Sequence, residues 1–505
     1  MMQHVLEAFR LVCDPLVLGV VLGSALFGLF VGAMPGLTAT MAVALLVPVT
    51  FNLPPLPAIA AMVTATAMAI FAGDIPGALL RIPGTPASAA YCDEAYAMTR
   101  NGEAETMLGA GLVFSAIGGL FGTVVLVTTA PALAEVALKF SSFEYFWLVT
   151  LGLTCAVFIA PGRPLKGLAS LLIGLLIATV GFENPAAYPR FTFGSDELMS
   201  GFQLTPVMIG MFAVSEVIRY AVTRDVPLEV PKQGIGRIFR GQGALLRKYP
   251  LAALRGSALG TVVGALPGAG ADIAAWISYG LSKRFSKTPE KYGTGHVEGV
   301  IEAGSANNSA LSAAWIPALV FGVPGDSITA IVIGVLYLKG MNPGPTIFIE
   351  NPQNIYAVFI IFFLANLLML PLGWMAIKAA KNVLRVPRNV LMPVILLFCV
   401  VGAFAINNSI FDVGVMLAFG LLAWFMEANR FPIAPTILGL VLGGMLEQNF
   451  VTSMIKADGA PGAFFGRPIA GTLGVATLLV WLSPLALRWR RGRRAARADK
   501  VARVS

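Results

Sequence analysis

Long apolar stretches alternate with short polar ones along almost the whole chain, from Pro15 to Leu487. Each long stretch can cross the roughly 30 Å hydrocarbon core of a bilayer as one helix of about 20 residues. The third and tenth stretches are too long for one helix, so we expect each to be a helix followed by a broken hairpin. The pattern predicts fifteen candidate crossings, at about 15–34, 36–51, 56–90, 107–129, 143–160, 166–182, 204–222, 250–267, 269–282, 301–338, 354–377, 390–408, 411–427, 434–449 and 469–487.

Composition supports a membrane protein and excludes a soluble one. Of the 505 residues, 57% are hydrophobic and 12% are charged, whereas a soluble protein is about a quarter charged. The loops are too short to hold a separate soluble domain. We therefore predict an all-α polytopic membrane protein.

The net charge of +9 does not indicate nucleic-acid binding, because most basic residues lie in short loops beside apolar stretches. The last basic cluster, Arg488–Arg494, directly follows the final apolar stretch. Basic juxtamembrane segments favour the cytoplasmic side, so we expect a cytoplasmic C-terminus. The N-terminus lacks the pattern of a cleaved signal peptide, and the 15–34 stretch is expected to remain in the protein.

Two sequence blocks recur in the same order in the second half. GLFVGAMPG at 28–36 is matched by GTVVGALPG at 260–268, and IPGALLRIPG at 75–84 is matched by IPALVFGVPG at 316–325. The offsets, 232 and 241 residues, are nearly equal. Seven predicted crossings separate the halves, and this odd number predicts that the repeats are inverted in the membrane.

The repeat divides the chain into five parts. Residues 1–222 form the first membrane repeat, 223–249 a cytoplasmic linker, and 250–449 the second repeat. A final loop and transmembrane helix follow at 450–487, and the basic cytoplasmic tail occupies 488–505. Inverted repeats with interrupted membrane segments at matching positions are typical of secondary transporters.

The Pro-Gly breaks are the candidate substrate site. Each break frees backbone groups that lipid cannot satisfy, and helix N-termini at such breaks can face an anion. Plain structural kinks remain the alternative. The substrate-binding candidates are Gly36, Thr38, Pro83, Gly84, Thr85, Pro86, Ser88, Gly268, Asn307, Asn308, Pro324, Gly325, Asp326 and Ser327.

Polar and ionisable residues within apolar stretches are the other candidates, because such residues are costly in a membrane. Their oxygens suit a coupling Na⁺ or H⁺, although interhelical hydrogen bonding or an aqueous mouth would also explain them. Asp74 and Arg81 are seven residues apart and could form an ion pair. The cation-coupling candidates are Asn307, Asn308, Asp326 and Asp272, and the charged candidates are Asp74, Arg81 and Glu302. No other metal and no cofactor is expected: the four cysteines lie far apart and there are only two histidines.

These motifs resemble the large membrane subunit of the tripartite tricarboxylate transporter family over nearly the whole chain. The resemblance lies in GAMPGLT at 32–38, PGTPASAA at 83–90, GALPGAGA at 264–271, VEGV at 297–300, ANN at 306–308 and VPG at 323–325. It implies a Na⁺- or H⁺-coupled importer of organic di- or tricarboxylates in the bacterial inner membrane. It also implies a small membrane subunit of about four helices and a periplasmic solute-binding protein as partners.

The chain differs from the usual family pattern at four ionisable positions, Asp74, Arg81, Asp272 and Asp326, and in the loop at 91–94. Arg81 could clamp a carboxylate, whereas the acids favour a cationic or zwitterionic substrate. Other readings are a permease for another small polar solute, an ion channel, or the permease of an ATP-driven system. A membrane enzyme is disfavoured because no nucleophile–base pair is evident.

Overall fold

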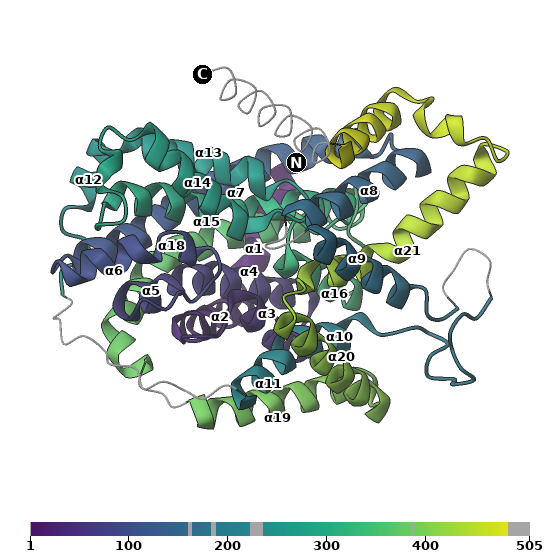
Figure 1. Ribbon diagram of the computed structural model, residues 1–505, viewed down its shortest axis with the longest axis horizontal. Helices are drawn as coiled ribbons and strands as arrows, with labels where there is room; N and C mark the ends of the chain where they lie inside the picture. Colours follow the sequence, from purple (N-terminus) through teal and green to yellow (C-terminus); the bar gives the residue numbers. More distant parts are fainter. Residues whose placement is uncertain (1, 160–163, 183–187, 223–235, 385–387, 483–505) are drawn as a thin grey trace, which may run out of the picture.

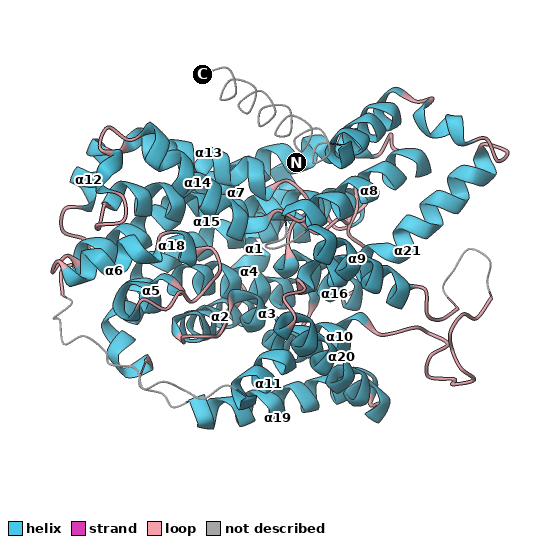
Figure 2. Cartoon of the chain, in the orientation of Figure 1, coloured by secondary structure: helices cyan, strands magenta, loops and turns pink. Residues whose placement is uncertain are grey.

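The computed structural model describes the chain except residues 1, 160–163, 183–187, 223–235, 385–387 and 483–505. The described residues form helices joined by loops, and no strand (Figures 1 and 2). In the first half the α-helices are α1 (Met2–Val12), α2 (Pro15–Ala33), α3 (Ala39–Thr50), α4 (Pro55–Ala72), α5 (Asp74–Leu80), α6 (Cys92–Arg100), α7 (Ala104–Ala137), α8 (Ser142–Ile159), α9 (Pro164–Ala178), α10 (Leu204–Ile209) and α11 (Ser215–Val222).

The second half continues the all-α pattern. Its α-helices are α12 (Gln242–Lys248), α13 (Pro250–Gly264), α14 (Gly270–Phe285), α15 (Val297–Phe321), α16 (Ser327–Leu338), α17 (Ile347–Glu350), α18 (Pro352–Val383), α19 (Arg388–Asn407), α20 (Ile410–Ala428) and α21 (Ile433–Lys456). A last apolar helix follows at Pro468–Leu482. The 3₁₀-helices are η1 (Ser88–Ala90), η3 (Pro289–Lys291) and η4 (Pro461–Phe465), and η2 (Gly210–Val214) is a π-helix between α10 and α11.

Seven of the described helical stretches are long and apolar enough to cross a membrane, and further apolar helices are shorter. Large apolar side chains stand exposed on outer helices such as α19, where Leu397, Phe398 and Val401 are each more than half exposed. Water would make such a surface costly, whereas lipid makes it favourable. The prediction of an all-α polytopic membrane protein is confirmed.

The two halves share a helix–break–helix pattern. The segment between α2 and α3 passes through Gly36 with φ 86°, and the segment between α13 and α14 passes through Gly268 with φ 80°. Such positive φ values favour glycine. These two glycines are 232 residues apart, which is the offset of the first pair of sequence blocks.

The second pair of blocks matches in backbone conformation as well. The break after α5 begins at Arg81 with φ 59°, and the break after α15 begins at Gly322 with φ 67°. These residues are 241 positions apart. The third and tenth predicted crossings are therefore broken segments, as expected.

Close packing in the two halves also follows the two offsets. A Cβ placed on Gly28 would lie 2.3 Å from the Ala65 carbonyl oxygen, and one on Gly260 would lie 2.3 Å from the Ala306 carbonyl oxygen. Absence of a Cβ lets α2 pack directly on α4 and α13 on α15. Figure 1 shows the first group, α2–α4, beside the second, α13–α15.

Some predicted features differ. The 91–94 segment is not a simple loop, because Cys92 begins α6. α1, α6 and α12 lie outside the predicted crossings. The repeat matches in local structure, while its inversion across the membrane and the domain limits remain predictions. Much of the 223–249 linker and the whole 488–505 tail lie outside the described residues.

Candidate functional site

A cavity of about 750 Å³ lies where the broken segments meet. Its walls come from the breaks of both halves and from a second group of helices, α8, α11, η2, α20 and α21. The lining residues from the breaks are Thr38, Ala39, Thr40, Thr85, Pro86, Gly268, Ala269, Gly270, Ala271, Asp272, Asp326, Ser327 and Ile328, joined by Asn307 of α15.

Three helices begin at this cavity. The first residues of α3, α14 and α16 all line it. Thr38 caps α3, accepting a hydrogen bond from the Met41 amide at 3.2 Å. Asp326 caps α16 and forms a capping box with Thr329. Helix N-termini carry partial positive charge and free N–H groups, so the arrangement favours an anion.

Two carboxylates face the same space. Asp272 is exposed to the cavity, and its Oδ1 accepts a hydrogen bond from the Ala87 amide at 3.1 Å. A Cβ placed on Gly270 would lie 2.6 Å from the Cβ of Asp326, so the start of α14 abuts Asp326. Asp272 thus joins the first-half break to the second-half site.

Hydroxyl groups and one indole complete the contacts between the breaks. The Thr40 and Ser327 hydroxyl oxygens are 3.4 Å apart and connect the starts of α3 and α16. The Trp276 indole donates to the Pro86 carbonyl oxygen at 3.1 Å. These pairs join residues from different halves, so the cavity depends on both repeats.

Charged residues at another part of the wall were missed by sequence reasoning. Glu216, Arg219 and Glu427 line the cavity, and Arg219 pairs with both carboxylates, 3.9 Å from Glu427. The adjacent π-helix η2 is a further signal, since π-helices are rare and frequent at functional sites. Sequence periodicity does not reveal a five-residue π-helix inside an apolar stretch.

The structure brings together eight of the eighteen predicted site residues. Residues that line the cavity are Thr38, Thr85, Pro86, Gly268, Asn307, Asp326, Ser327 and Asp272. Those that do not line it are Gly36, Pro83, Gly84, Ser88, Asn308, Pro324, Gly325, Asp74, Arg81 and Glu302. The loop residues in the second set shape the breaks: Gly84, for example, packs against Gly73 and Gly32 and leaves no room for a Cβ.

Asn308 points away from the cavity. Its side-chain amide lies 3.7 Å from the Met369 sulfur on α18 and is fully buried. Neighbouring helical residues point about 100° apart, which explains why Asn307 reaches the cavity and Asn308 does not.

The ion pair that the sequence allowed between Asp74 and Arg81 does not form, because each side chain has another partner. Arg81 pairs with Asp93, its Nη2 2.9 Å from Oδ1, and both side chains are largely exposed. The break after α5 turns Arg81 outward, whereas Asp74 is buried at the start of α5. Arg81 is therefore no cavity clamp in this structure.

Glu302 forms a structural pair. Its buried carboxylate accepts from the guanidinium of Arg255 in two places, from Nε at 2.7 Å and from Nη2. The pair ties α13 to α15 beside their close glycine contacts. Because Arg255 pairs with Glu302, no ligand is needed to explain a charged residue in this apolar stretch.

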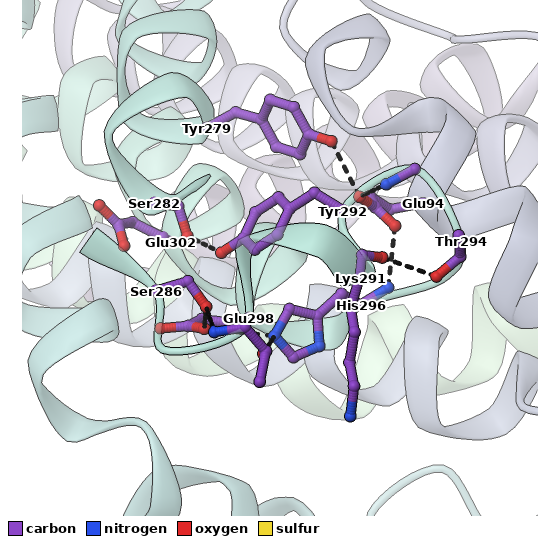
Figure 3. Close-up of polar contacts among 12 residues, drawn as sticks. Glu94, Tyr279, Ser282, Ser286, Lys291, Tyr292, Thr294, His296, Glu298 and Glu302 are labelled. Carbon is purple, nitrogen blue, oxygen red and sulfur yellow. Dashed lines mark hydrogen bonds and ion pairs between the residues drawn. The ribbon is translucent and has the colours of Figure 1, made fainter. Parts of the chain in front are cut away.

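A second buried carboxylate, Glu94 of α6, binds the loop between α14 and α15 (Figure 3). Glu94 accepts hydrogen bonds from the Tyr279 hydroxyl at 2.8 Å, from the Gly295 and His296 amides at 2.8 Å each, and from the Gly293 amide. Burial raises the pKa of Tyr292 in the same loop to about 12, so its hydroxyl stays protonated beside Ser282. This network fastens α6, in the first half of the chain, to α14 and the loop that follows it, in the second half.

Residues 18–438 match the family model described as the Tripartite tricarboxylate transporter TctA family. The chain belongs to the TctA family. It is 33% identical over 462 residues, 91% of this chain and 92% of the relative, to an uncharacterised 52.8 kDa protein in the TAR-I ttuC' 3' region of Agrobacterium vitis.

A second relative of this TctA family member, a protein in the TAR-II ttuC' 3' region of Agrobacterium vitis, is 33% identical over 228 residues. That match covers 45% of this chain and 94% of the relative. No solved structure matches the chain. The family match makes the chain a transporter subunit and confirms the resemblance noted from the sequence motifs.

Proposed function

We propose that the chain is the large membrane subunit of a binding-protein-dependent secondary transporter that imports organic di- or tricarboxylates with Na⁺ or H⁺. The observation that carries the proposal is the convergence of the α3, α14 and α16 N-termini on one cavity. A carboxylate there would meet backbone N–H groups and hydroxyls without a large fixed positive charge. It could therefore be bound and also released.

The acids in the cavity wall support cation coupling. The wall contains four carboxylates, Glu216, Asp272, Asp326 and Glu427, against one guanidinium, Arg219. An anionic substrate would be repelled unless protons or cations neutralised part of this charge. Import of the carboxylate together with H⁺ or Na⁺ resolves the conflict.

The same acids favour a second candidate function, import of a small cationic or zwitterionic solute. Such a solute would pair with Asp272 or Asp326 without a coupling cation. Uptake measurements with a panel of labelled citrate, succinate, amino acids and polyamines distinguish the two. Carboxylate uptake that competes only with other carboxylates supports the first, and uptake limited to amines supports the second.

Family membership supports two partners, a small membrane subunit and a periplasmic solute-binding protein, which would deliver the carboxylate. It also supports placement in the bacterial inner membrane. We expect uptake in cells to require the genes for both partners, and an ATPase to be dispensable.

Replacing Asn307 by Ala should lower the apparent affinity for transported citrate or succinate about ten- to a hundredfold. Asn307 is buried yet lines the cavity, so its side-chain amide N–H groups are placed to donate a hydrogen bond to a carboxylate there. A hydrogen bond to a charged ligand contributes about 1.5–3 kcal/mol. Initial uptake rates at varied substrate concentration measure the change.

The neighbouring Asn308→Ala is the matched control. This variant removes an equally buried amide on the side of α15 that faces α18, so we expect a smaller change in affinity. Protein amount in the membrane is measured for both. Equal affinity in wild type and Asn307→Ala would remove Asn307 from the site.

Topology gives a separate prediction. The loops at 237–248 and 283–291 and the tail after 488 should be cytoplasmic, and those at 183–201 and 339–351 periplasmic, because basic residues concentrate in the first set. In a cysteine-free chain, Leu198→Cys should react with an impermeant thiol reagent in intact cells, and Gly243→Cys should not. The reverse labelling would contradict the orientation.

A further inference from the structure

Behind the cavity wall lies a buried acid that the transport site does not contact directly. Asp74, the first residue of α5, is 2% exposed. Its Oδ1 accepts a hydrogen bond of 2.6 Å from the Tyr91 hydroxyl, while its Oδ2 has no partner. A buried carboxylate with one unsatisfied oxygen is costly as an anion. Protonation of the carboxyl group removes this cost.

Tyr91 connects this acid to the cavity. Its side chain is 1% exposed, and its hydroxyl interacts with Asp74 on one side and with the Asn307 side chain on the other. Asn307 lines the cavity, and its Oδ1 lacks a partner. Three buried polar groups from α5, the turn before α6, and α15 therefore form a continuous chain that ends at the proposed substrate site.

Other charges around α5 are engaged elsewhere. On α6, Asp93 pairs with Arg81 on the exposed side, and Glu94 binds the 293–296 backbone. On α7, Glu105 accepts hydrogen bonds from backbone amides of the 236–237 segment. The thiol of Cys92, also on α6, donates to the Gly77 carbonyl oxygen of α5 at 3.6 Å. The described ion pairs thus include no cation that neutralises Asp74.

We propose that Asp74 binds a proton, and that its protonation reverses the hydrogen bonds through Tyr91 so that Asn307 offers its amide N–H groups to a carboxylate in the cavity. The inference rests on the proposed import of carboxylates and adds the residue that couples a proton to it. One proton is taken up, and no other bond is made or broken.

The reversal follows from the donors and acceptors present. With Asp74 ionised, the Tyr91 hydroxyl must donate to it, so Tyr91 can only accept from the Asn307 amide nitrogen. With Asp74 protonated on Oδ1, the oxygen that contacts Tyr91, the acid donates to the Tyr91 oxygen, and the hydroxyl is free to donate to Asn307 Oδ1. The side-chain amide then turns its nitrogen toward the cavity, where a carboxylate accepts a hydrogen bond.

Infrared difference spectra of the purified full chain, recorded between low and high pH, test proton binding without any substrate. Wild type should show the carbonyl band of a protonated carboxylic acid that Asp74→Asn lacks. Asp93→Asn, which removes the exposed neighbouring acid, and Asp272→Asn should both keep the band. Tyr91→Phe should keep it at a shifted frequency, because the acid loses its hydrogen-bond partner. A band unchanged in Asp74→Asn would overturn the proposal.

Uptake measurements at varied pH test whether protonation of Asp74 is linked to substrate binding. In cells that express the chain with its partner genes, the apparent affinity for labelled citrate or succinate should fall about tenfold for each pH unit above the titration midpoint, since one proton is linked. Asp74→Asn should bind at high pH as wild type does at low pH, because the Asn amide donates to Tyr91 permanently. Tyr91→Phe should also lose the pH dependence.

Steep, wild-type pH dependence in both Asp74→Asn and Tyr91→Phe would contradict the link. If wild type transports neither carboxylate at any pH, the proposed function fails instead, and the infrared spectra still decide whether Asp74 binds a proton.

Discussion

Cation-driven accumulation of citrate or succinate should fall about a hundredfold in Asp272→Asn, while exchange of internal for external substrate persists. The Asp272 carboxylate is exposed to the cavity and accepts a hydrogen bond from the Ala87 amide in the first-half break. The start of its helix, α14, also abuts Asp326. Loss of its charge removes a cation-binding group but leaves the helix N-termini that face the anion. A charge-assisted interaction of about 1.5–3 kcal/mol corresponds to a tenfold to hundredfold effect.

The experiment compares net uptake driven by a Na⁺ or H⁺ gradient with exchange in the absence of a gradient. Asp93→Asn is the control, because Asp93 is an exposed acid paired with Arg81 away from the cavity. We expect wild-type values for both activities in the control. Undiminished gradient-driven accumulation in Asp272→Asn would exclude Asp272 as a cation-binding group.

Glu94→Ala should destabilise the protein by about 3–5 kcal/mol, enough to remove most folded protein from the membrane. Its buried carboxylate accepts from Tyr279 and from three backbone amides of the 293–296 segment (Figure 3). The substitution leaves these donors without an acceptor, and removal of one partner from a buried charged network is strongly destabilising. Fluorescence size-exclusion chromatography and thermal unfolding of the purified chain measure the loss.

Two variants calibrate this result. Glu94→Gln keeps one side-chain oxygen acceptor, so an intermediate loss is expected. Asn101→Ala removes one exposed hydrogen bond of 3.3 Å to the Thr294 carbonyl oxygen in the same loop, and should change the unfolding temperature little. A Glu94→Ala protein as stable as wild type would show that another contact fastens α6 to the loop.

The sequence predicted the fold class and the broken segments because both depend on local patterns. Apolar length sets the helices, and Pro-Gly pairs interrupt them at Pro83 and Pro324. The repeat was also readable, since glycines are required where backbone approaches backbone, as at Gly28 and Gly260. α6 was missed because its nine residues are too few to cross a membrane and include three charged ones, Asp93, Glu94 and Arg100.

The site was only partly predictable. The Pro-Gly motifs identified the cavity residues Thr38 and Gly268, but they did not separate residues that shape a break from residues that face the cavity. Asn307 and Asn308 are adjacent in sequence and point in different directions. Tyr91 lies far along the chain from Asn307, and Arg219 lies far from Glu427, so only the tertiary packing brings these groups together.

The central claim is that substrate passes through the cavity between the starts of α3, α14 and α16. Ser327→Cys in a chain whose four native cysteines are replaced by Ala or Ser tests it most directly, because Ser327 lines the cavity beside Thr40. Thiol labelling of this variant should proceed in membranes and be slowed by the transported carboxylate, but not by an equal concentration of an untransported anion. Labelling whose rate is unaffected by saturating substrate, in a variant that still transports, would contradict the claim.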